Sequence, residues 1–445
     1  MITGLKEKFE DLLFTRGVQG LSPEGSLVIK AVDLIISQAL EERASDIHVE
    51  PMKEGLRVRY RIDGILYEVL RITKETLPVI PRIKIMAELD PDVGRSHTPQ
   101  DGRFSLQLGS REVDVRVSTF PTILGEKIAM RLLEKETTFL KLDQLGLSPA
   151  VQQCYESMIQ KPNGMVFVTG PTNSGKTSTL YATLAALNTP QKNIMTLEDP
   201  VEYQVKGISQ GQINPKVGLT FSSGLRSLLR QDPNVIMVGE IRDVETAEIS
   251  IRASLTGHLV FSTLHTNDAV GAVVRLLDMG IEPFLIASSM IGVVAQRLVR
   301  KICPTCRVAE KPSTQLVETL EISEETKGKE SSSPAPRKDE FYIVGEEKEP
   351  PKPKPPEVRE SGVTFYKGKG CKACYQIGYR GRLGIFELLE VTEEIGQLIL
   401  KKSPSSALRT VALRSGMKTM RDDGFEKVKA GVTTVEEVLR VTRET

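Results

Sequence analysis

The chain has 445 residues, of which 40% are hydrophobic and 26% are charged, and its formal net charge is +1. This length predicts two or three domains, and the near-neutral charge argues against a protein that coats nucleic acid or anionic lipid. The sequence contains no apolar run approaching the roughly 18 residues of a membrane span, and its charged N-terminus is unlike a signal peptide. We therefore expect a cytoplasmic protein.

The first part of the sequence predicts an α+β domain. Apolar residues recur at helical spacing over Leu27–Leu40, and a short strand follows. Two hairpins are expected, one turning at Asp63-Gly64 and the other at Gly109-Ser110, with a helix over Leu77–Leu89 between them. This patterning ends near Leu140 and gives way to another helical run before the next domain.

The stretch Gly164–Thr177 carries a G-x-x-x-x-G-K-[ST] motif, which is a phosphate-binding loop. An apolar, β-branched run precedes the motif and a segment without glycine or proline follows it, which is the strand and helix context that this loop requires. We expect its backbone N–H groups to bind the phosphates of ATP, Lys176 to neutralise the β- and γ-phosphates, and Thr177 to bind Mg²⁺. A chance glycine-rich turn is the alternative. The candidate nucleotide-binding residues are Gly170, Pro171, Thr172, Asn173, Ser174, Gly175, Lys176, Thr177 and Ser178.

Titratable residues follow three apolar runs downstream of this loop, and these runs read as strands of an α/β sheet. The residues are Glu198, Glu240 and His265. Because open parallel sheets bind ligands at the carboxyl ends of their strands, we expect these residues near the nucleotide. Glu240 is the candidate base that orients and deprotonates the attacking water, and Glu198 is the next candidate. A solvated charge at a strand end is the simpler interpretation of Glu240.

Four of the five cysteines form two C-x-x-C pairs, Cys303 with Cys306 and Cys371 with Cys374. In a reducing compartment such pairs indicate a metal rather than disulfides, and four thiolates suit a tetrahedral structural Zn²⁺ site. Small buried hydrophobes or a redox pair are the alternatives. The remaining cysteine, Cys154, stands apart, and we expect it to be a buried helix residue.

The fold class that follows is α/β with additional domains on either side of the core. A segment rich in Lys, Glu, Ser and Pro lies between the two cysteine pairs and is expected to be a disordered or extended insertion. The proposed divisions are an unassigned segment 1–25, an α+β domain 26–140, a P-loop core 145–301, a four-cysteine subdomain 302–390 that contains the insertion 310–361, and a helical subdomain 391–445.

Taken together, these motifs resemble the secretion-type ATPase family of type II secretion and type IV pilus assembly. The resemblance rests on the phosphate-binding loop and on five further boxes in the family's order. They are Asp46–Pro51, Gln100–Arg103, Glu198–Pro200, Val235–Glu240 and Gly257–Ala269, the last three being the aspartate box, Walker B and the histidine box. The resemblance implies a RecA-like core preceded by a PAS-like domain. It also implies an ATP- and Mg²⁺-dependent motor that extrudes pilin-like subunits from the membrane.

The resemblance also assigns catalytic roles that the residues alone do not. By this resemblance Arg116 and Arg131 reach the γ-phosphate, and His258 and His265 belong to the active site. Without it, each arginine would more often be a surface ion-pair partner. Asn173 departs from the family, which has glycine at this position, and we expect altered loop geometry rather than lost binding.

Partners are likewise implied by the resemblance. They are a homo-hexamer and an inner-membrane platform protein, with peripheral association at the inner face of the cytoplasmic membrane through these partners and no direct contact with nucleic acid. Only residues 1–26 precede the match, where larger members carry a docking domain, so we expect the charged insertion or another subunit to recruit the motor.

Three other functions stay open. A retraction motor of the same family is one, although four cysteines are typical of the assembly and secretion branch. A helicase or DNA-uptake motor is another, and near-zero charge with 13 Phe, 9 Tyr and no Trp argues against it. A scaffold that does not hydrolyse ATP is the third, and the presence of Lys176, Thr177, Glu198 and Glu240 counts against it.

Overall fold

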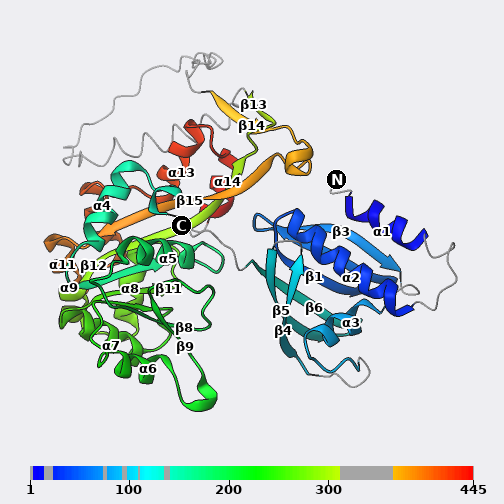
Figure 1. The fold of residues 1–445 in the computed structure, drawn as a ribbon. Coiled ribbons are helices and arrows are strands. Elements are labelled where there is room, and N and C mark those ends of the chain that lie inside the picture. The colour runs from blue at the N-terminus through cyan, green and yellow to red at the C-terminus, as the bar shows by residue number, and fades with distance from the viewer. Residues whose placement is uncertain are drawn as a thin grey trace, which may run out of the picture.

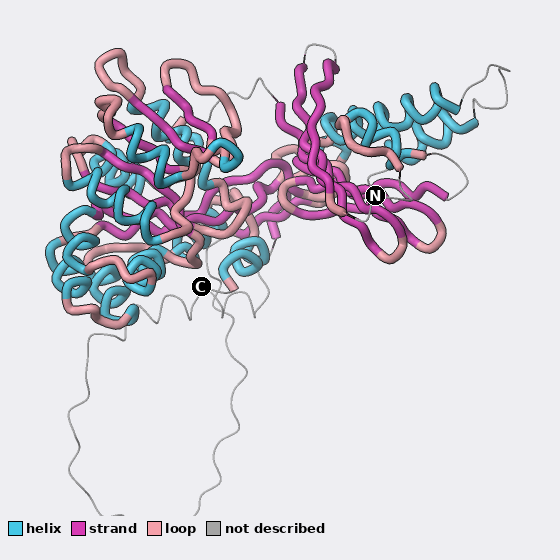
Figure 2. The backbone as a smooth tube through the Cα atoms, turned by 90° about the horizontal axis from the view of Figure 1, so that it is seen from below, coloured by secondary structure: helices cyan, strands magenta, loops and turns pink. Residues whose placement is uncertain are grey.

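The computed structural model describes residues 4–14, 24–73, 78–92, 98–108, 111–134, 141–310 and 364–443, and every structural statement below refers to these residues. The predicted insertion 310–361, apart from its first residue, and the Gly109-Ser110 turn lie outside them. Two bodies lie side by side, each built on its own β-sheet (Figures 1 and 2).

The first domain is a six-stranded antiparallel sheet covered by helices, with strand order β3-β2-β1-β6-β5-β4. Its strands are β1 (Ala44–Met52), β2 (Gly55–Ile62), β3 (Ile65–Thr73), β4 (Gln100–Leu108), β5 (Arg111–Thr122) and β6 (Gly125–Glu134). Its helices are α1 (Gly4–Phe14), α2 (Glu24–Glu41) and α3 (Val79–Met86). Both predicted hairpins are confirmed, because β2 pairs with β3 and β4 pairs with β5.

Alternation along the strands separates an apolar face from a charged face in this sheet. Ile47 and Val49 of β1 are fully buried in the cluster formed with α1, α2 and α3. The Tyr60 hydroxyl donates to the backbone oxygen of Ile35 at 2.6 Å and ties α2 to this face. Side chains at the alternate positions, Asp46 among them, point away from these helices. The sheet therefore presents charged groups toward the second domain.

The second domain is a seven-stranded sheet of order β15-β12-β7-β11-β10-β8-β9, in which only the β12–β15 pair is antiparallel. Its strands are β7 (Gly164–Thr169), β8 (Ile194–Glu198), β9 (Ser209–Gln212), β10 (Val235–Val238), β11 (Leu259–Leu264), β12 (Met290–Ile302) and β15 (Tyr379–Glu390). Its helices are α4 (Pro149–Ile159), α5 (Lys176–Leu187), α6 (Phe221–Leu228), α7 (Val244–Leu255), α8 (Ala269–Asp278) and α9 (Pro283–Ser289).

Helices cover both faces of this sheet, which is why its central strands are apolar throughout. Every residue of β7 is buried. Phe167 packs with α6 to α9 on one face, whereas Val168 packs with α4 and α5 on the other. The three strands predicted downstream of the phosphate loop are confirmed as β8, β10 and β11. Cys154 lies on α4 as predicted but is only partly buried, so that part of the expectation was wrong.

The C-terminal region adds a short hairpin and four helices to the core. The hairpin pairs β13 (Arg307–Glu310) with β14 (Phe365–Gly368), and the helices are α11 (Glu393–Leu400), α12 (Ser405–Arg414), α13 (Met420–Lys429) and α14 (Val435–Thr442). These helices pack into the same cluster as α6 to α9, so the predicted helical C-terminal segment is confirmed and forms part of the core.

The segment after the second cysteine pair forms one of the contacts between the two domains. The Tyr375 hydroxyl donates to the backbone oxygen of Glu41 at 3.1 Å, and Ile377 packs against the first domain's hydrophobic cluster. The backbone N–H of Gly381 donates to the Asp63 carboxylate at 2.8 Å, across the tip of the β2–β3 hairpin. The four-cysteine region thus supplies part of the contact that holds the first domain.

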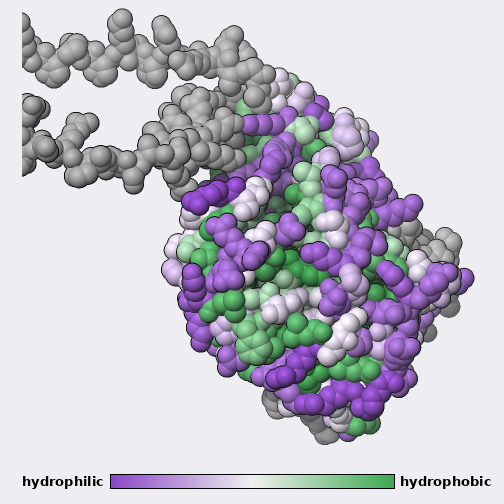
Figure 3. All heavy atoms as spheres, turned by 90° about the vertical axis from the view of Figure 1, so that its left-hand side faces the viewer, coloured by the Kyte–Doolittle hydropathy of each residue, from purple (hydrophilic) through white to green (hydrophobic). Residues whose placement is uncertain are grey.

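Within the described residues, no helix has the length and apolar character needed to cross a membrane. The outer face of the core domain carries hydrophilic residues with hydrophobic ones interspersed, which is the ordinary composition of a protein surface (Figure 3).

Candidate active site

The phosphate loop connects the end of β7 to the first residue of α5. Gly170 has φ 147°, and a Cβ there would lie 2.5 Å from the backbone oxygen of Gln296, so only glycine fits. Gly175 has φ 92° and caps the helix. Asn173 has φ 64°, and asparagine is among the side chains that tolerate this left-handed region best. Asparagine is therefore compatible with the backbone at this position.

The Lys176 side chain folds back over the phosphate loop. Its Nζ donates to the backbone oxygens of Gly170 at 2.8 Å and Pro171 at 3.1 Å. Burial of the ammonium lowers the pKa of Lys176 to about 8; the Glu240 carboxylate opposes this shift and the Arg297 guanidinium adds to it. The loop residues Pro171 to Asn173, together with Thr177 and Ser178, are exposed and accessible to a ligand.

Glu240 follows β10 and lies within electrostatic reach of Lys176. Its carboxylate accepts from Arg242 at 2.6 Å and lies 3.6 Å from Nε2 of His265. Burial lowers the pKa of His265, with Lys176 adding to the effect and Glu240 opposing it, and this shift favours the neutral imidazole. The structure thus brings Lys176, Glu240 and His265 together at the carboxyl ends of their strands.

Glu198 lies at the end of β8, but its carboxylate is already engaged. It accepts from the Tyr181 hydroxyl at 2.5 Å, from the Thr196 hydroxyl at 2.6 Å and from the Gln210 amide at 3.0 Å. The side chain is buried, and burial together with this contact raises the pKa of Tyr181 well above its usual range. A carboxylate with three donors is better placed to hold the strand end than to accept a proton from water.

Gln296 of β12 contacts the phosphate loop and was missed by the sequence motifs. Its Nε2 donates to the backbone oxygen of Ser174 at 2.8 Å, and its Oε1 accepts from the Thr179 hydroxyl at 2.8 Å. The next residue, Arg297, donates to the Asn267 side chain at 3.0 Å in the histidine box. Both residues belong to a strand that is distant in sequence, and no local spacing could have identified them.

The arginines assigned by resemblance lie on the charged face of the first domain. Together with Asp46 they line a cleft of about 1360 Å³, whose opposite wall is Pro200 to Gln204 of the second domain. Nη1 of Arg116 lies 3.3 Å from the Glu202 carboxylate, and Nε of Arg131 lies 3.0 Å from Asp46. In this arrangement both arginines pair with carboxylates, and the cleft does not include the phosphate loop.

His258 is separated from these groups. It precedes β11, and its backbone oxygen accepts from the N–H of Gly164 at the amino end of β7, whereas the phosphate loop begins at the carboxyl end of that strand. Its Nδ1 lies 2.9 Å from the backbone oxygen of Ala253. Because β7 is six residues long, the structure does not bring His258 together with Lys176.

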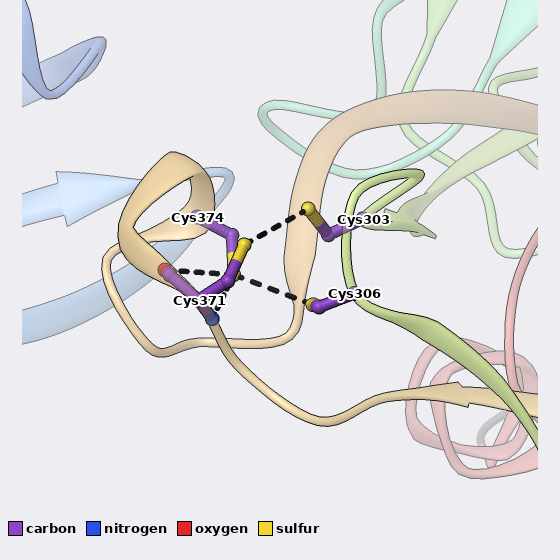
Figure 4. A group of neighbouring side chains, drawn as sticks. All are labelled: Cys303, Cys306, Cys371 and Cys374. Carbon is purple, nitrogen blue, oxygen red and sulfur yellow. Dashed lines mark hydrogen bonds between the residues drawn. The ribbon is translucent and has the colours of Figure 1, made fainter.

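The four cysteines converge from two loops, Cys303 with Cys306 and Cys371 with Cys374, and their Sγ atoms all lie within 4.8 Å of one another (Figure 4). Three of the Sγ–Sγ distances are 3.9, 3.8 and 3.7 Å. A tetrahedral zinc with Zn–S bonds of about 2.3 Å requires edges of about 3.8 Å. The Cys374 sulfur also accepts from the backbone N–H of Gly378 at 3.3 Å. The cluster therefore fits one metal ion.

Comparison with known proteins identifies the family of this chain. The family model described as type II/IV secretion system protein matches residues 22–440. The type II secretion system protein E of Pseudomonas aeruginosa is 48% identical over 418 residues, covering 94% of this chain and 76% of that protein. The type II secretion system ATPase E of Vibrio cholerae is 45% identical over 424 residues, covering 95% and 77%.

A solved structure shares the fold. The Legionella pneumophila ATPase DotB covers 93% of this chain and 95% of its own, with a TM-score of 0.63 and 20% identity. With the family model spanning almost the whole chain, the conclusion is that the chain belongs to the type II/IV secretion system protein family and is an ATPase of that family.

Proposed function

We propose that the chain is the ATP-hydrolysing motor of a type II secretion or type IV pilus assembly machine. The observation that carries this proposal is the proximity of Lys176, Glu240 and His265 beside an exposed phosphate loop. The two relatives described above are type II secretion proteins that are 48% and 45% identical to this chain, which supports the secretion assignment.

The chemistry of the site divides among a few residues. The backbone N–H groups of the loop bind the phosphates, Lys176 neutralises the β- and γ-oxygens, and the Thr177 hydroxyl binds Mg²⁺. Glu240 accepts the proton of the attacking water, because its carboxylate is only partly buried and lies beside His265, with Arg242 as a hydrogen-bond donor. Glu198 positions the end of β8, since three donors already occupy it.

The proposed function extends to the other domains, the metal and the oligomeric state. The divisions 26–140, 145–301, 302–390 and 391–445 correspond to a PAS-like domain, a RecA-like core, a zinc subdomain and a helical subdomain. The metal is Zn²⁺ with a structural role, because four thiolates leave no position for a substrate or water. A homo-hexamer allows Arg116 and Arg131 to reach a γ-phosphate in a neighbour or in the same chain.

The same proposal covers location and partners. The motor acts in the cytoplasm at the inner face of the membrane, where a platform protein of the machine recruits it. Assembly and secretion are favoured over retraction, since the four-cysteine cluster is typical of that branch.

Hydrolysis is tested by two substitutions. Lys176→Ala should abolish ATP binding measured by calorimetry, because it removes the charge on the β- and γ-phosphates. Glu240→Gln should bind ATP like the wild type but hydrolyse it slower by orders of magnitude, because the amide keeps the shape and loses the base. A wild-type rate in Glu240→Gln would contradict the assigned base, and unchanged ATP affinity in Lys176→Ala would contradict the phosphate loop.

A further inference from the structure

A buried threonine lies between the phosphate loop and His265. Thr169 is the last residue of β7 and directly precedes Gly170, the first glycine of the loop. Its Oγ1 lies 3.0 Å from the backbone oxygen of Leu264 and accepts from the backbone N–H of Thr266 at 3.0 Å. Leu264 and Thr266 flank His265 in the sequence. The Thr169 hydroxyl therefore holds the backbone on both sides of this histidine.

A second buried threonine holds the backbone around Glu240 in a similar way. The Thr263 hydroxyl donates to the backbone oxygen of Gly239 at 2.7 Å, and the Thr263 backbone oxygen accepts from the N–H of Ile241 at 3.1 Å. Gly239 and Ile241 flank Glu240. Because β11, which carries Thr263, lies between β7 and β10, the two threonines link the ends of three neighbouring strands.

Burial makes both hydroxyls hard to replace. Thr169 is 0% exposed and Thr263 is 5% exposed, so water has little access to the backbone groups that would lose a partner. The side chains that they position are more open, since His265 is 52% exposed and Glu240 is 21% exposed. The distance of 3.6 Å between Nε2 of His265 and the Glu240 carboxylate therefore depends chiefly on where their backbones are held.

We propose that Thr169 is a positioning residue for ATP hydrolysis, which couples the phosphate loop to the spacing between His265 and Glu240, and that Thr263 continues this coupling to β10. The proposal rests on the proposed function, because it takes Glu240 as the base. Thr169 is joined covalently to Gly170, so a loop that adjusts to bound phosphates also moves the Thr169 hydroxyl and the backbone around His265. Each threonine acts through the backbone that it holds and not by touching the reacting atoms.

The test compares two substitutions of Thr169. Valine replaces the hydroxyl with a methyl group, whereas serine keeps the hydroxyl. Thr169→Val should lower kcat about 10-fold or more with a smaller change in KM for ATP, because a small misplacement of a catalytic group affects mainly the chemical step. Thr169→Ser should keep most of the wild-type kcat. Thr263→Val should lower kcat less than Thr169→Val, since the bond from the Ile241 N–H to the backbone oxygen remains.

Thr433→Val is the matched control for a buried hydroxyl. Thr433 is 0% exposed, and its hydroxyl donates to the backbone oxygen of Arg300 at 2.8 Å. This substitution should lower the melting temperature and keep the wild-type kcat. A double-mutant cycle then tests the path of the effect. If Thr169 acts through His265, Thr169→Val should change kcat by less than about 2-fold in a protein that already carries His265→Ala.

Other outcomes would overturn the proposal. A wild-type kcat in Thr169→Val or in His265→Ala would exclude the positioning role, and so would a Thr169→Val effect that is undiminished in the His265→Ala protein. If Thr169→Val does not fold, a wild-type kcat in Thr263→Val would exclude the coupling. Wild-type protein that fails to hydrolyse ATP would refute the proposed function instead, so the two failures are distinguishable.

Discussion

The guanidinium of Arg300, near the end of β12, donates from Nη1 to the Tyr67 hydroxyl at 3.1 Å and joins the core to the β2–β3 hairpin of the first domain. The same guanidinium donates to Glu437 of α14 at 2.6 Å. Four residues earlier on β12, Gln296 holds the phosphate loop. A single strand therefore contacts both the phosphate loop and the other domain.

One contact between the domains is the hydrogen bond from the Gly381 N–H to the Asp63 carboxylate, and hydrogen exchange of that amide can measure it. Asp63→Ala should speed hydrogen exchange of the Gly381 N–H by at least about 10-fold, because that N–H loses the Asp63 carboxylate as its acceptor. Glu68→Gln is the control, since Glu68 lies on the neighbouring strand of the same hairpin and pairs with Arg71. Equal protection of Gly381 in both variants would show that this contact does not hold the domains together in solution.

Gln296 should act by holding the phosphate loop in shape. Gln296→Glu places a carboxylate against the Ser174 carbonyl in a site that is only 2% exposed, and a buried group without its partner costs about 1–3 kcal/mol. ATP affinity should fall about 5- to 150-fold, with a smaller effect on kcat, because the loop binds substrate and transition state alike.

Thr183→Val is the matched control for Gln296→Glu. Thr183 is buried one helical turn after Thr179 and bonds to the Thr179 backbone oxygen, but not to the loop. The Thr183→Val substitution should lower the melting temperature without changing ATP affinity. If Gln296→Glu also lowered only the melting temperature, a positioning role for Gln296 would be excluded.

Local patterns were sufficient to predict the strands and hairpins of this chain, because burial imposes periodicity on them. The Asp63-Gly64 turn and the β10 run Val235–Val238 both form as predicted. The phosphate loop could also be predicted from the sequence, because the positive φ angles of the loop require glycine at fixed positions. Gln296 could not be predicted from local spacing, since its role depends on the pairing of β12 with β7. The resemblance that names His258 and His265 does not state that the two residues lie at opposite ends of β11.

Metal removal should loosen the contact between the four-cysteine region and the first domain. We expect about one zinc per chain, since the four thiolates form one tetrahedral site. Tyr375 and Ile377 follow Cys374 directly and contact the first domain, so a chelator that removes the metal should also speed exchange at Gly381. Cys371→Ser should lose the metal, whereas Cys154→Ser should keep it. Less than a tenth of one zinc in freshly purified, chelator-free protein would rule out this site.

The pKa of Lys176 predicts how ATP affinity depends on pH. In the nucleotide-free protein burial lowers this pKa to about 8, so the ammonium loses its proton as pH rises through 8. Bound phosphates favour the charged form, so affinity should be highest below pH 8 and fall above it, with proton uptake accompanying binding at pH 9. Calorimetry in two buffers of different ionisation enthalpy measures this uptake. Lys176→Arg, which stays charged, supplies the baseline, and equal uptake at pH 7 and pH 9 would refute the assignment.

The last prediction concerns Arg116 and Arg131, which pair with carboxylates in this structure but are proposed to act on a γ-phosphate. If they do, Arg→Ala at either position should lower kcat far more than ATP affinity, because their charge is needed chiefly in the transition state. Lysine should rescue poorly, since an ammonium lacks the planar, two-pronged contact of a guanidinium.

The ion pair between Arg131 and Asp46 allows a test that separates a catalytic role of Arg131 from a structural one. Arg131 must leave Asp46 to reach phosphate, and Asp46 has a second partner in Arg61 at 3.5 Å, so the sheet should tolerate the change. Asp46→Asn should therefore keep or raise kcat, because it releases Arg131, whereas Arg131→Ala should lower kcat with little change in melting temperature. If the Asp46–Arg131 pair only braced β1 against β6, both variants would instead lose stability and activity together.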